Sequence, residues 1–213
     1  MRLSEWPESP TRLAQLIRDA DVRFRFGGTR PSQRAQRDSN SSASGSMIVT
    51  ANQLTAPDAE TLFELSFRYR SRCRWQMDRS ADNVIIDVNY TQLELIDRHS
   101  VWFRVEPAKD GFWDSPLTLH EMDHVQLSSD PRLGGRFKQL LEESSRLERP
   151  APPSRVTSQW LRQQIDTHVR AQFDKIVDLV RIRYQELDRQ TNHGRLPVRP
   201  DSDLERMLKQ AAG

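Results

Sequence analysis

The stretch 117–125 reads Leu-Thr-Leu-His-Glu-Met-Asp-His-Val and holds two histidines, His120 and His124, four residues apart. Residues four apart share one face of a helix, so both imidazoles can reach a single Zn²⁺. Glu121 follows the first histidine, where it can take a proton from water activated by the metal. This is the H-E-x-x-H arrangement of zinc metalloproteases. The alternative is an exposed helix face with two incidental histidines, but the pattern arises by chance on the order of 0.01 times per chain, and we predict a zinc site.

The sequence around this stretch predicts three helices. The Ser-Pro pair at 115–116 is typical of a helix start, so the motif begins one turn inside a helix that extends to about residue 128. An Asp-Pro pair opens a second predicted helix over 130–149. A long third helix is predicted over 154–189, where apolar residues recur every three to five positions and form one stripe.

Before the motif, the chain is mostly strand-like. Alternating or apolar runs predict strands at 72–78, 84–96 and 101–105, and an acidic start after a proline predicts a helix over 58–68. The predicted fold class is therefore α+β, with a small antiparallel sheet followed by the H-E-x-x-H helix and a long C-terminal helix.

The length of 213 residues suits one domain with tails. In the N-terminal part, a short helix at 11–20 and a strand at 22–26 are possible, but the Ser-rich stretch 30–46 cannot bury enough apolar surface to offset its ordering entropy. We predict three parts: a mostly disordered N-terminal tail and linker at 1–46, a folded domain at 47–195, and a C-terminal tail at 196–213.

Composition excludes several classes of protein. The 32 basic and 30 acidic residues leave a net charge of +2, which argues against a nucleic-acid binder. No apolar run approaches the ~20 residues of a membrane span. The N-terminus has no apolar signal core, which predicts a cytoplasmic protein as written, or an exported one if the true start lies upstream. The single cysteine, Cys73, excludes an intrachain disulfide and is predicted to be a small core residue.

Zinc in a hydrolase needs a third protein ligand and an open position for water. His193 is the favoured candidate, because it follows the long helix and Gly194 allows a sharp turn back towards the metal. Asp130, Glu142 and Glu143 are the alternatives. The two remaining histidines are predicted to lie elsewhere: His168 partly buried on the long helix, and His99 on the surface.

The order of these features resembles a known family. A strand-rich segment precedes Trp113 and the Leu-x-x-H-E-x-x-H helix, and the long helix ends in a Tyr…Asp…Thr-x-His-Gly pattern. This is similar to the bacterial zinc proteases grouped as domain of unknown function 922, over about residues 47–195. Asp123 and Val125 depart from the small and aromatic residues more often expected there. The resemblance implies a zincin-like fold and carries over eight residues: His120, Glu121, His124, Tyr184, Asp188, Thr191, His193 and Gly194.

The predicted function is a zinc-dependent metallopeptidase that acts on a peptide or protein, with Glu121 as general base. If the end of the long helix reaches the metal, Tyr184 is the candidate donor to the oxyanion of the transition state, and the strand 101–105 offers an edge for a substrate strand. Two alternatives remain: a non-catalytic domain stabilised by zinc, and a helical interaction domain that binds a partner through the stripe of 154–189. The oligomeric state is not predicted.

Overall fold

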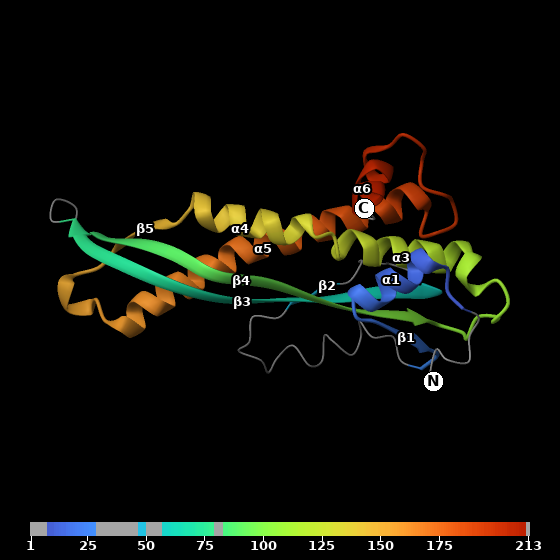
Figure 1. Ribbon diagram of the computed structural model, residues 1–213, viewed down its shortest axis with the longest axis horizontal. Helices are drawn as coiled ribbons and strands as arrows, with labels where there is room; N and C mark the ends of the chain where they lie inside the picture. Colours follow the sequence, from blue (N-terminus) through green and yellow to red (C-terminus); the bar gives the residue numbers. More distant parts are fainter. Residues whose placement is uncertain (1–7, 29–46, 50–56, 79–82, 212–213) are drawn as a thin grey trace. The chain divides into compact units, whose positions relative to one another are not determined.

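The computed structural model describes residues 8–28, 47–49, 57–78 and 83–211. The chain divides into two compact units. Unit 1 contains the described residues of 1–66, 97–131 and 177–213, and unit 2 contains those of 67–96 and 132–176. Two long strands and one long helix contribute residues to both units: β3 (Ala59–Asp78), β4 (Asn83–Phe103) and α5 (Ser158–Thr191) (Figure 1).

Unit 1 combines a sheet with helices from both ends of the chain. Its strand order is β1–β4–β3–β2. Strand β1 runs parallel to β4, from Val22 beside His99 to Phe26 beside Phe103, and β2 runs antiparallel to β3. The further elements of this unit are α1 (Thr11–Asp19), β1 (Val22–Phe26), β2 (Met47–Val49), the short 3₁₀ helix η3 (Phe112–Asp114), α3 (Pro116–Ser128) and α6 (Asp203–Ala211).

Helix α3 begins where the sequence predicts, because Ser115 caps it. The Ser115 hydroxyl accepts a hydrogen bond from the backbone N–H of Thr118 at 3.1 Å, and Pro116 occupies the first turn. The first N–H groups of a helix have no partner within it, so a cap of this kind contributes about 1 kcal/mol. The H-E-x-x-H motif therefore lies on a helix with a fixed start, in contact with α1, η3 and α6.

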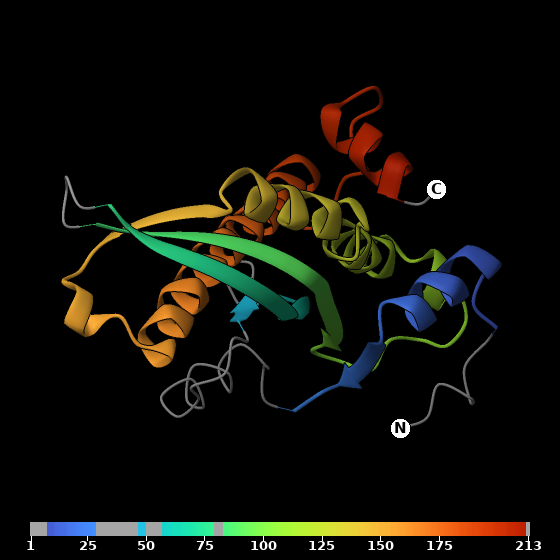
Figure 2. The same cartoon turned by 60° about the vertical axis from the view of Figure 1, so that its left-hand side comes forward.

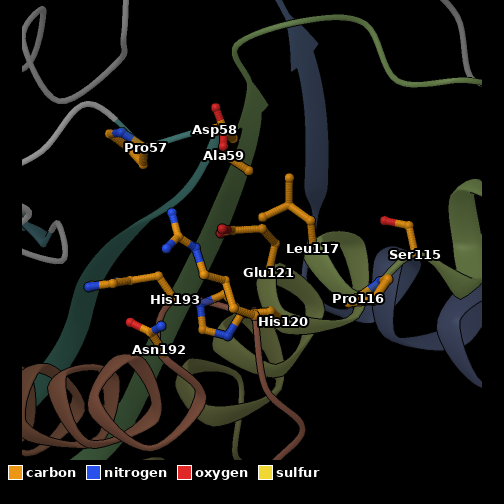
Figure 3. Close-up of a pocket in the computed structure, with 12 residues that line it drawn as sticks. Pro57, Asp58, Ala59, Ser115, Pro116, Leu117, His120, Glu121, Asn192 and His193 are labelled. Carbon is orange, nitrogen blue, oxygen red and sulfur yellow. The ribbon is translucent and has the colours of Figure 1, made fainter.

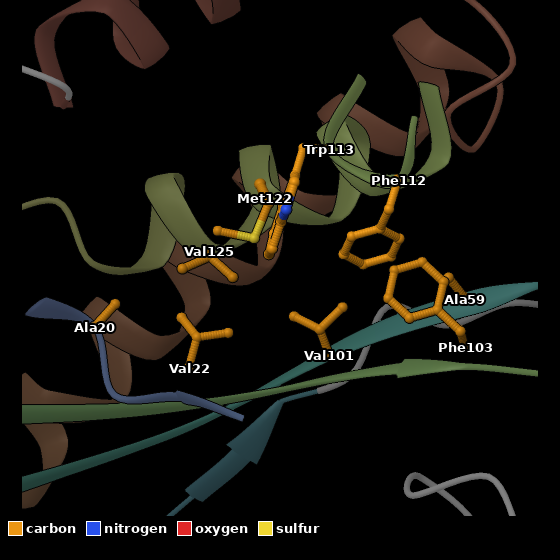
Figure 4. Close-up of a cluster of buried hydrophobic side chains, with 9 residues drawn as sticks. All are labelled: Ala20, Val22, Ala59, Val101, Phe103, Phe112, Trp113, Met122 and Val125. Atoms are coloured by element: carbon orange, nitrogen blue, oxygen red, sulfur yellow. The ribbon is translucent and has the colours of Figure 1, made fainter. Parts of the chain in front are cut away.

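A cluster of apolar side chains fixes the orientation of α3 (Figure 4). Met122 and Val125 of α3 pack in this cluster with Val101 and Phe103 of β4. The ring centroids of Phe103 and Phe112 lie 5.5 Å apart. At 100° per residue, the two core residues of α3 lie on the side opposite to His120 and His124, so packing on the sheet turns the histidines away from it.

Unit 2 contains part of the same five-stranded sheet and a core of its own. The strand order here is β3–β4–β5, and β5 runs antiparallel to β4. The rings of Phe67, Phe137 and Phe173 lie with their centroids 4.8–6.0 Å apart. They pack β3 against two helices, because Phe137 belongs to α4 (Arg132–Glu143) and Phe173 to α5. Besides its parts of β3, β4 and α5, this unit contains α4 (Arg132–Glu143), β5 (Arg146–Pro150) and the short 3₁₀ helix η4 (Pro153–Arg155).

The predicted fold class is confirmed in outline: the fold is α+β, with a small sheet, the motif helix and one long helix. The sheet is mixed and not antiparallel, since β1 and β4 are parallel. The apolar stripe of the long helix is buried along most of its length. It therefore forms core and does not present a free surface for a partner.

Two predicted helices are wrong, the first in type and the second in extent. Residues 59–68 belong to β3 and not to a helix. Its first five residues are all buried, and a short buried run has no period that separates strand from helix. The predicted helix over 130–149 ends at Glu143, because residues 146–150 pair with β4 as strand β5.

Other predictions also need correction. Residues 101–103 end β4 between β1 and β3, so this stretch is an interior strand with no free edge for a substrate. Cys73 is exposed and not a core residue.

The folded part of the chain extends beyond 47–195. Residues 8–28 contain α1 and β1, and Ala20 and Val22 join the core cluster of unit 1, while residues 203–211 form α6. The predicted linker at 30–46 lies outside the described residues. Among the described helices, none combines the length and apolar character needed to cross a membrane.

The core cluster generates the first prediction. Phe103→Ala removes a side chain that is only 2% exposed and packs between Phe26 and Phe112. We expect a loss of about 3–5 kcal/mol in the free energy of unfolding, measured by denaturant titration. The control, Val105→Ala, truncates a side chain that is 73% exposed and should change stability by less than about 0.5 kcal/mol. Equal effects of the two substitutions would contradict this packing.

Candidate metal centre

Three buried side chains of unit 1 converge on one point: His120 and His124 of α3 and Asp188 of α5. The Nε2 atoms of the two histidines are 3.2 Å apart. Each also lies close to Oδ1 of Asp188, at 3.2 Å for His120 and 3.1 Å for His124. All three side chains are at least nine-tenths buried. The group could bind a metal ion.

The spacing of these three atoms fits a tetrahedral centre. Ligands at about 2.0–2.2 Å from a metal lie about 3.3–3.6 Å from one another at the corners of a tetrahedron. The observed separations of 3.1–3.2 Å are close to that edge length. As metal ligands both imidazoles would be neutral and would turn their lone pairs towards the same point as the carboxylate, where a shared cation would stabilise all three groups.

Hydrogen bonds behind His120 determine which of its nitrogens faces the cluster. The Thr191 hydroxyl donates its one proton to the Leu187 carbonyl at 2.8 Å. Its oxygen therefore accepts the hydrogen bond from Nδ1 of His120 at 3.2 Å, and that nitrogen carries the proton. In the neutral form of His120 the lone pair then lies on Nε2, towards His124 and Asp188, which is the tautomer a metal requires.

Asp188 is held as a carboxylate. Burial raises the pKa of this group, but the hydrogen bonds and charges of His120 and His124 outweigh burial and lower the pKa below its usual range. An ionised carboxylate without a cation is costly in a buried position. Asp188 therefore supplies the negative charge that makes the cluster a cation site.

A left-handed turn follows α5 and closes against the cluster. Asn192, His193 and Gly194 have φ angles of 48°, 56° and 79°. The N–H of His193 donates to the Asp188 carbonyl at 3.1 Å, which anchors the turn to the helix end. A left-handed conformation costs about 1–2 kcal/mol in a residue with a side chain. Such strain persists where the surroundings enforce it, often at functional sites.

Gly194 is the residue of this turn that no side chain can replace without a clash. A Cβ atom there would lie 2.9 Å from Cβ of His120 and 3.0 Å from Cγ. The chain therefore passes directly against the imidazole of His120. Together with Thr191, this close contact limits the movement of the ring.

Glu121 lies beside the cluster on the same helix and is 3% exposed. Thr61 of β3 donates a hydrogen bond to its Oε2 atom at 2.6 Å. Burial raises the pKa of Glu121 to about 7, although the charge of His120 and the hydrogen bond from Thr61 act in the opposite direction. The structure thus brings a second carboxylate close to the three converging side chains without making it one of them.

Tyr184 packs against the cluster, but its hydroxyl has another partner. Its ring centroid is 4.3 Å from that of His124, and its hydroxyl lies 2.8 Å from Oγ of Ser128. Nδ1 of His99 donates to the Ala20 carbonyl at 2.8 Å, and the Ser128 hydroxyl lies 2.7 Å from Nε2 of His99 and 3.0 Å from the His124 carbonyl. Ser128 is therefore the hydrogen-bond partner of the Tyr184 hydroxyl. Its predicted role as an oxyanion donor stays a prediction.

A cavity of about 520 Å³ lies beside His120 and Glu121 (Figure 3). Its walls come from three segments of unit 1: the start of β3, the first turns of α3, and the left-handed turn after α5. Asn192 and His193 border it from that turn. The cavity gives a bound molecule access to one member of the cluster and to the neighbouring carboxylate.

The structure brings together part of the predicted ligand set. His120 and His124 meet as expected, whereas the third converging group is Asp188. His193 lies next to it, with Nδ1 3.4 Å from Oδ1 of Asp188, and its side chain is 50% exposed. The role of His193 as a metal ligand stays a prediction, now in competition with Asp188.

The other candidates lie in different settings. Asp130 is buried and accepts a hydrogen bond from Arg183 at 3.1 Å. Glu142 and Glu143 are exposed on α4. His168 is buried on α5, close to the prediction, and its ring contacts Ser144 at 3.0 Å. The surface position predicted for His99 is wrong, because its two ring nitrogens bond Ala20 and Ser128 inside unit 1.

Asp188 belongs to the family pattern but is not among the ligands that the sequence predicts. A signal was present: Asp188 lies four residues after Tyr184 and one after Leu187, within the apolar stripe of the long helix. A carboxylate on the buried face of a helix needs a partner or a metal. Applied to the stripe, that rule singles out this residue.

Comparisons with protein-family models, with curated proteins and with solved structures found no match for this chain. The resemblance to the family known as domain of unknown function 922 therefore rests on the motifs alone.

The contact between Gly194 and His120 generates a second prediction. Gly194→Ala should lower the free energy of unfolding by about 1–2 kcal/mol from backbone strain, plus the cost of displacing the His120 ring. Gly111→Ala is the matched control, since Gly111 has a φ of 72° and nothing within 4 Å of its Cβ position. Urea denaturation of the metal-free protein measures both. An equal loss in the two variants would contradict the close contact.

Proposed function

We propose that this chain is a zinc-dependent metallopeptidase in which His120, His124 and Asp188 hold the metal and Glu121 is the general base. The observation that carries the proposal is the convergence of two imidazole nitrogens and one carboxylate oxygen, 3.1–3.2 Å apart and buried, beside a cavity that Glu121 lines. The H-E-x-x-H spacing on one capped helix supports the same function.

The set of ligand atoms supports zinc as the metal. Catalytic zinc sites use three protein ligands, among them two histidines with one carboxylate, and keep a further position open. The same set binds iron(II) in some oxygenases, so the metal itself has to be measured. Glu121 favours the hydrolase, because a carboxylate beside the first histidine serves as a base there. Bound zinc would polarise a carbonyl group and lower the pKa of water towards ~7.

Each protein residue then has a definite task. Thr61 holds Oε2 of Glu121, which leaves Oε1 to accept a proton from water in the cavity. Glu121 later returns the proton to the nitrogen of the leaving amine. Thr191 keeps His120 in the tautomer with its lone pair on Nε2. The cavity volume of about 520 Å³ falls within the range of about 300–1,000 Å³ typical of ligand pockets and accommodates a short peptide segment.

The third prediction concerns metal content. Purified wild-type protein should contain about one zinc per chain by elemental analysis, as expected for one centre with three protein ligands. His120→Ala, His124→Ala and Asp188→Ala should each lose it, because two ligands retain zinc poorly. His193→Ala should keep the metal, which separates its role from that of Asp188.

Asp203→Ala is the control, since it removes an exposed carboxylate of the same unit without touching the cluster. Zinc retained in Asp188→Ala but lost in His193→Ala would contradict the proposed ligand set. Iron in place of zinc would contradict the hydrolase.

The fourth prediction separates catalysis from metal binding. Glu121→Gln keeps the size of the side chain and an oxygen to accept the Thr61 hydrogen bond, but it removes the base. We expect unchanged zinc content and a loss of about 10²–10⁴-fold in hydrolysis of a casein-derived peptide pool, measured by mass spectrometry. Glu60→Gln on β3 is the matched control, because it changes a neighbouring buried carboxylate. Wild-type protein that binds zinc but cleaves nothing would favour the non-catalytic alternative.

A further inference from the structure

Positive charge is concentrated in unit 2. Residues 67–96 and 132–176 contain fourteen arginine and lysine residues against nine aspartate and glutamate residues, an excess of five. The whole chain carries only +2. The net charge of the whole chain is therefore near zero although unit 2 is basic, and the positive charge of this unit attracts acidic partners at a distance.

Part of this excess of positive charge lies on strand β3. Arg68, Arg70, Arg72 and Arg74 occupy every second position of the strand, and all four are exposed. Alternate residues of a strand share one face and repeat about every 6.6–6.8 Å, so the four guanidinium groups form a row, the arginine row. No ion pair or hydrogen bond joins any of these guanidinium groups to another residue in the described part of the chain.

One edge of the same strand segment has no strand partner among the described residues. In unit 2, β3 pairs with β4 on one side, and the two strands run side by side (Figure 2). Strand β2 pairs only with residues 63–65, which belong to unit 1. Along residues 67–78, the outward-facing backbone N–H and C=O groups on the other side have no strand partner in the described ranges, so a further strand can pair with them there.

We propose that this edge of β3 binds an extended, acidic segment of another polypeptide, which adds to the sheet as a strand with carboxylates at alternate positions. The inference is independent of the metal centre. Strand addition provides backbone hydrogen bonds, and alternate side chains provide specificity.

The spacing of the arginine row matches the spacing of acidic side chains on an extended peptide. An extended peptide with Glu or Asp at every second residue presents carboxylates at the same repeat of about 6.6–6.8 Å as the arginine row. Each carboxylate can then meet one guanidinium across the strand pair, where opposite charges stabilise and Arg can bind in bidentate geometry.

Two other occupants fit less well. A second copy of this chain would place arginines opposite arginines, which is destabilising. Single-stranded nucleic acids are held by aromatic rings on which bases stack. The exposed aromatic residue of this stretch, Trp75, lies at an odd-numbered position and faces away from the arginine row.

The fifth prediction tests the charge match on the full chain. The probe is a fluorescein-labelled eleven-residue peptide of alternating Glu and Thr, with binding measured by fluorescence anisotropy. The double variant Arg70→Glu, Arg72→Glu should bind it at least about tenfold more weakly and should gain affinity for the matching Lys-Thr peptide. The control, Arg136→Glu with Arg155→Glu, changes the same number of exposed arginines away from β3 and should bind nearly as wild type.

Strand addition is tested on the wild-type protein, so the result does not depend on the folding of a variant. The Glu-Thr peptide N-methylated at every residue keeps its charges but lacks the N–H groups for pairing along both of its edges, and it should lose most of its binding. Three outcomes would overturn the proposal: no binding of the unmodified peptide, equal weakening in both double variants, or binding that N-methylation leaves unchanged. Tighter binding of a twenty-nucleotide DNA than of the peptide would also overturn it.

Discussion

The carboxylate of Asp188 faces two imidazole nitrogens inside a buried site, and much of unit 1 serves to hold these three groups together. Burial destabilises each of these groups on its own, because a carboxylate and two imidazoles lose their hydration and need a partner inside the protein to compensate for that cost. The packing that places them must therefore be strong. Ser115 fixes the start of α3, and the core on its opposite side fixes its rotation, so the histidines can only point towards α5.

The left-handed turn after α5 has a second structural task. It places Gly194 against the His120 ring and a half-exposed His193 beside Asp188 and at the cavity. The positive φ angles of Asn192 and His193 are unfavourable, and the hydrogen bonds to the helix end compensate for part of that cost. The cavity, Glu121 and this turn thus lie on the same side of the cluster, next to His120.

The sequence predicts the local parts of this arrangement and misses the long-range one. Helix α3, its cap and the pairing of His120 with His124 depend on residues within one short segment, and these predictions are confirmed. Asp188 is 64 residues from His124, and its position depends on how α5 packs onto α3, which no local pattern contains. The first half of β3 was missed for a related reason, because burial on both faces removes the alternation that marks a strand. The predicted burial of His99 and Cys73 was wrong for the same reason, because burial depends on tertiary contacts that a local pattern does not contain.

The most direct test of the central claim is a crystal structure of the zinc-loaded protein with anomalous data collected on both sides of the zinc absorption edge. The account predicts one anomalous peak at about 2.0–2.2 Å from Nε2 of His120, Nε2 of His124 and a carboxylate oxygen of Asp188. It also predicts that Glu121 lies near the peak without binding it. A peak that His193 holds in place of Asp188, or no peak between the two histidines, would contradict the account.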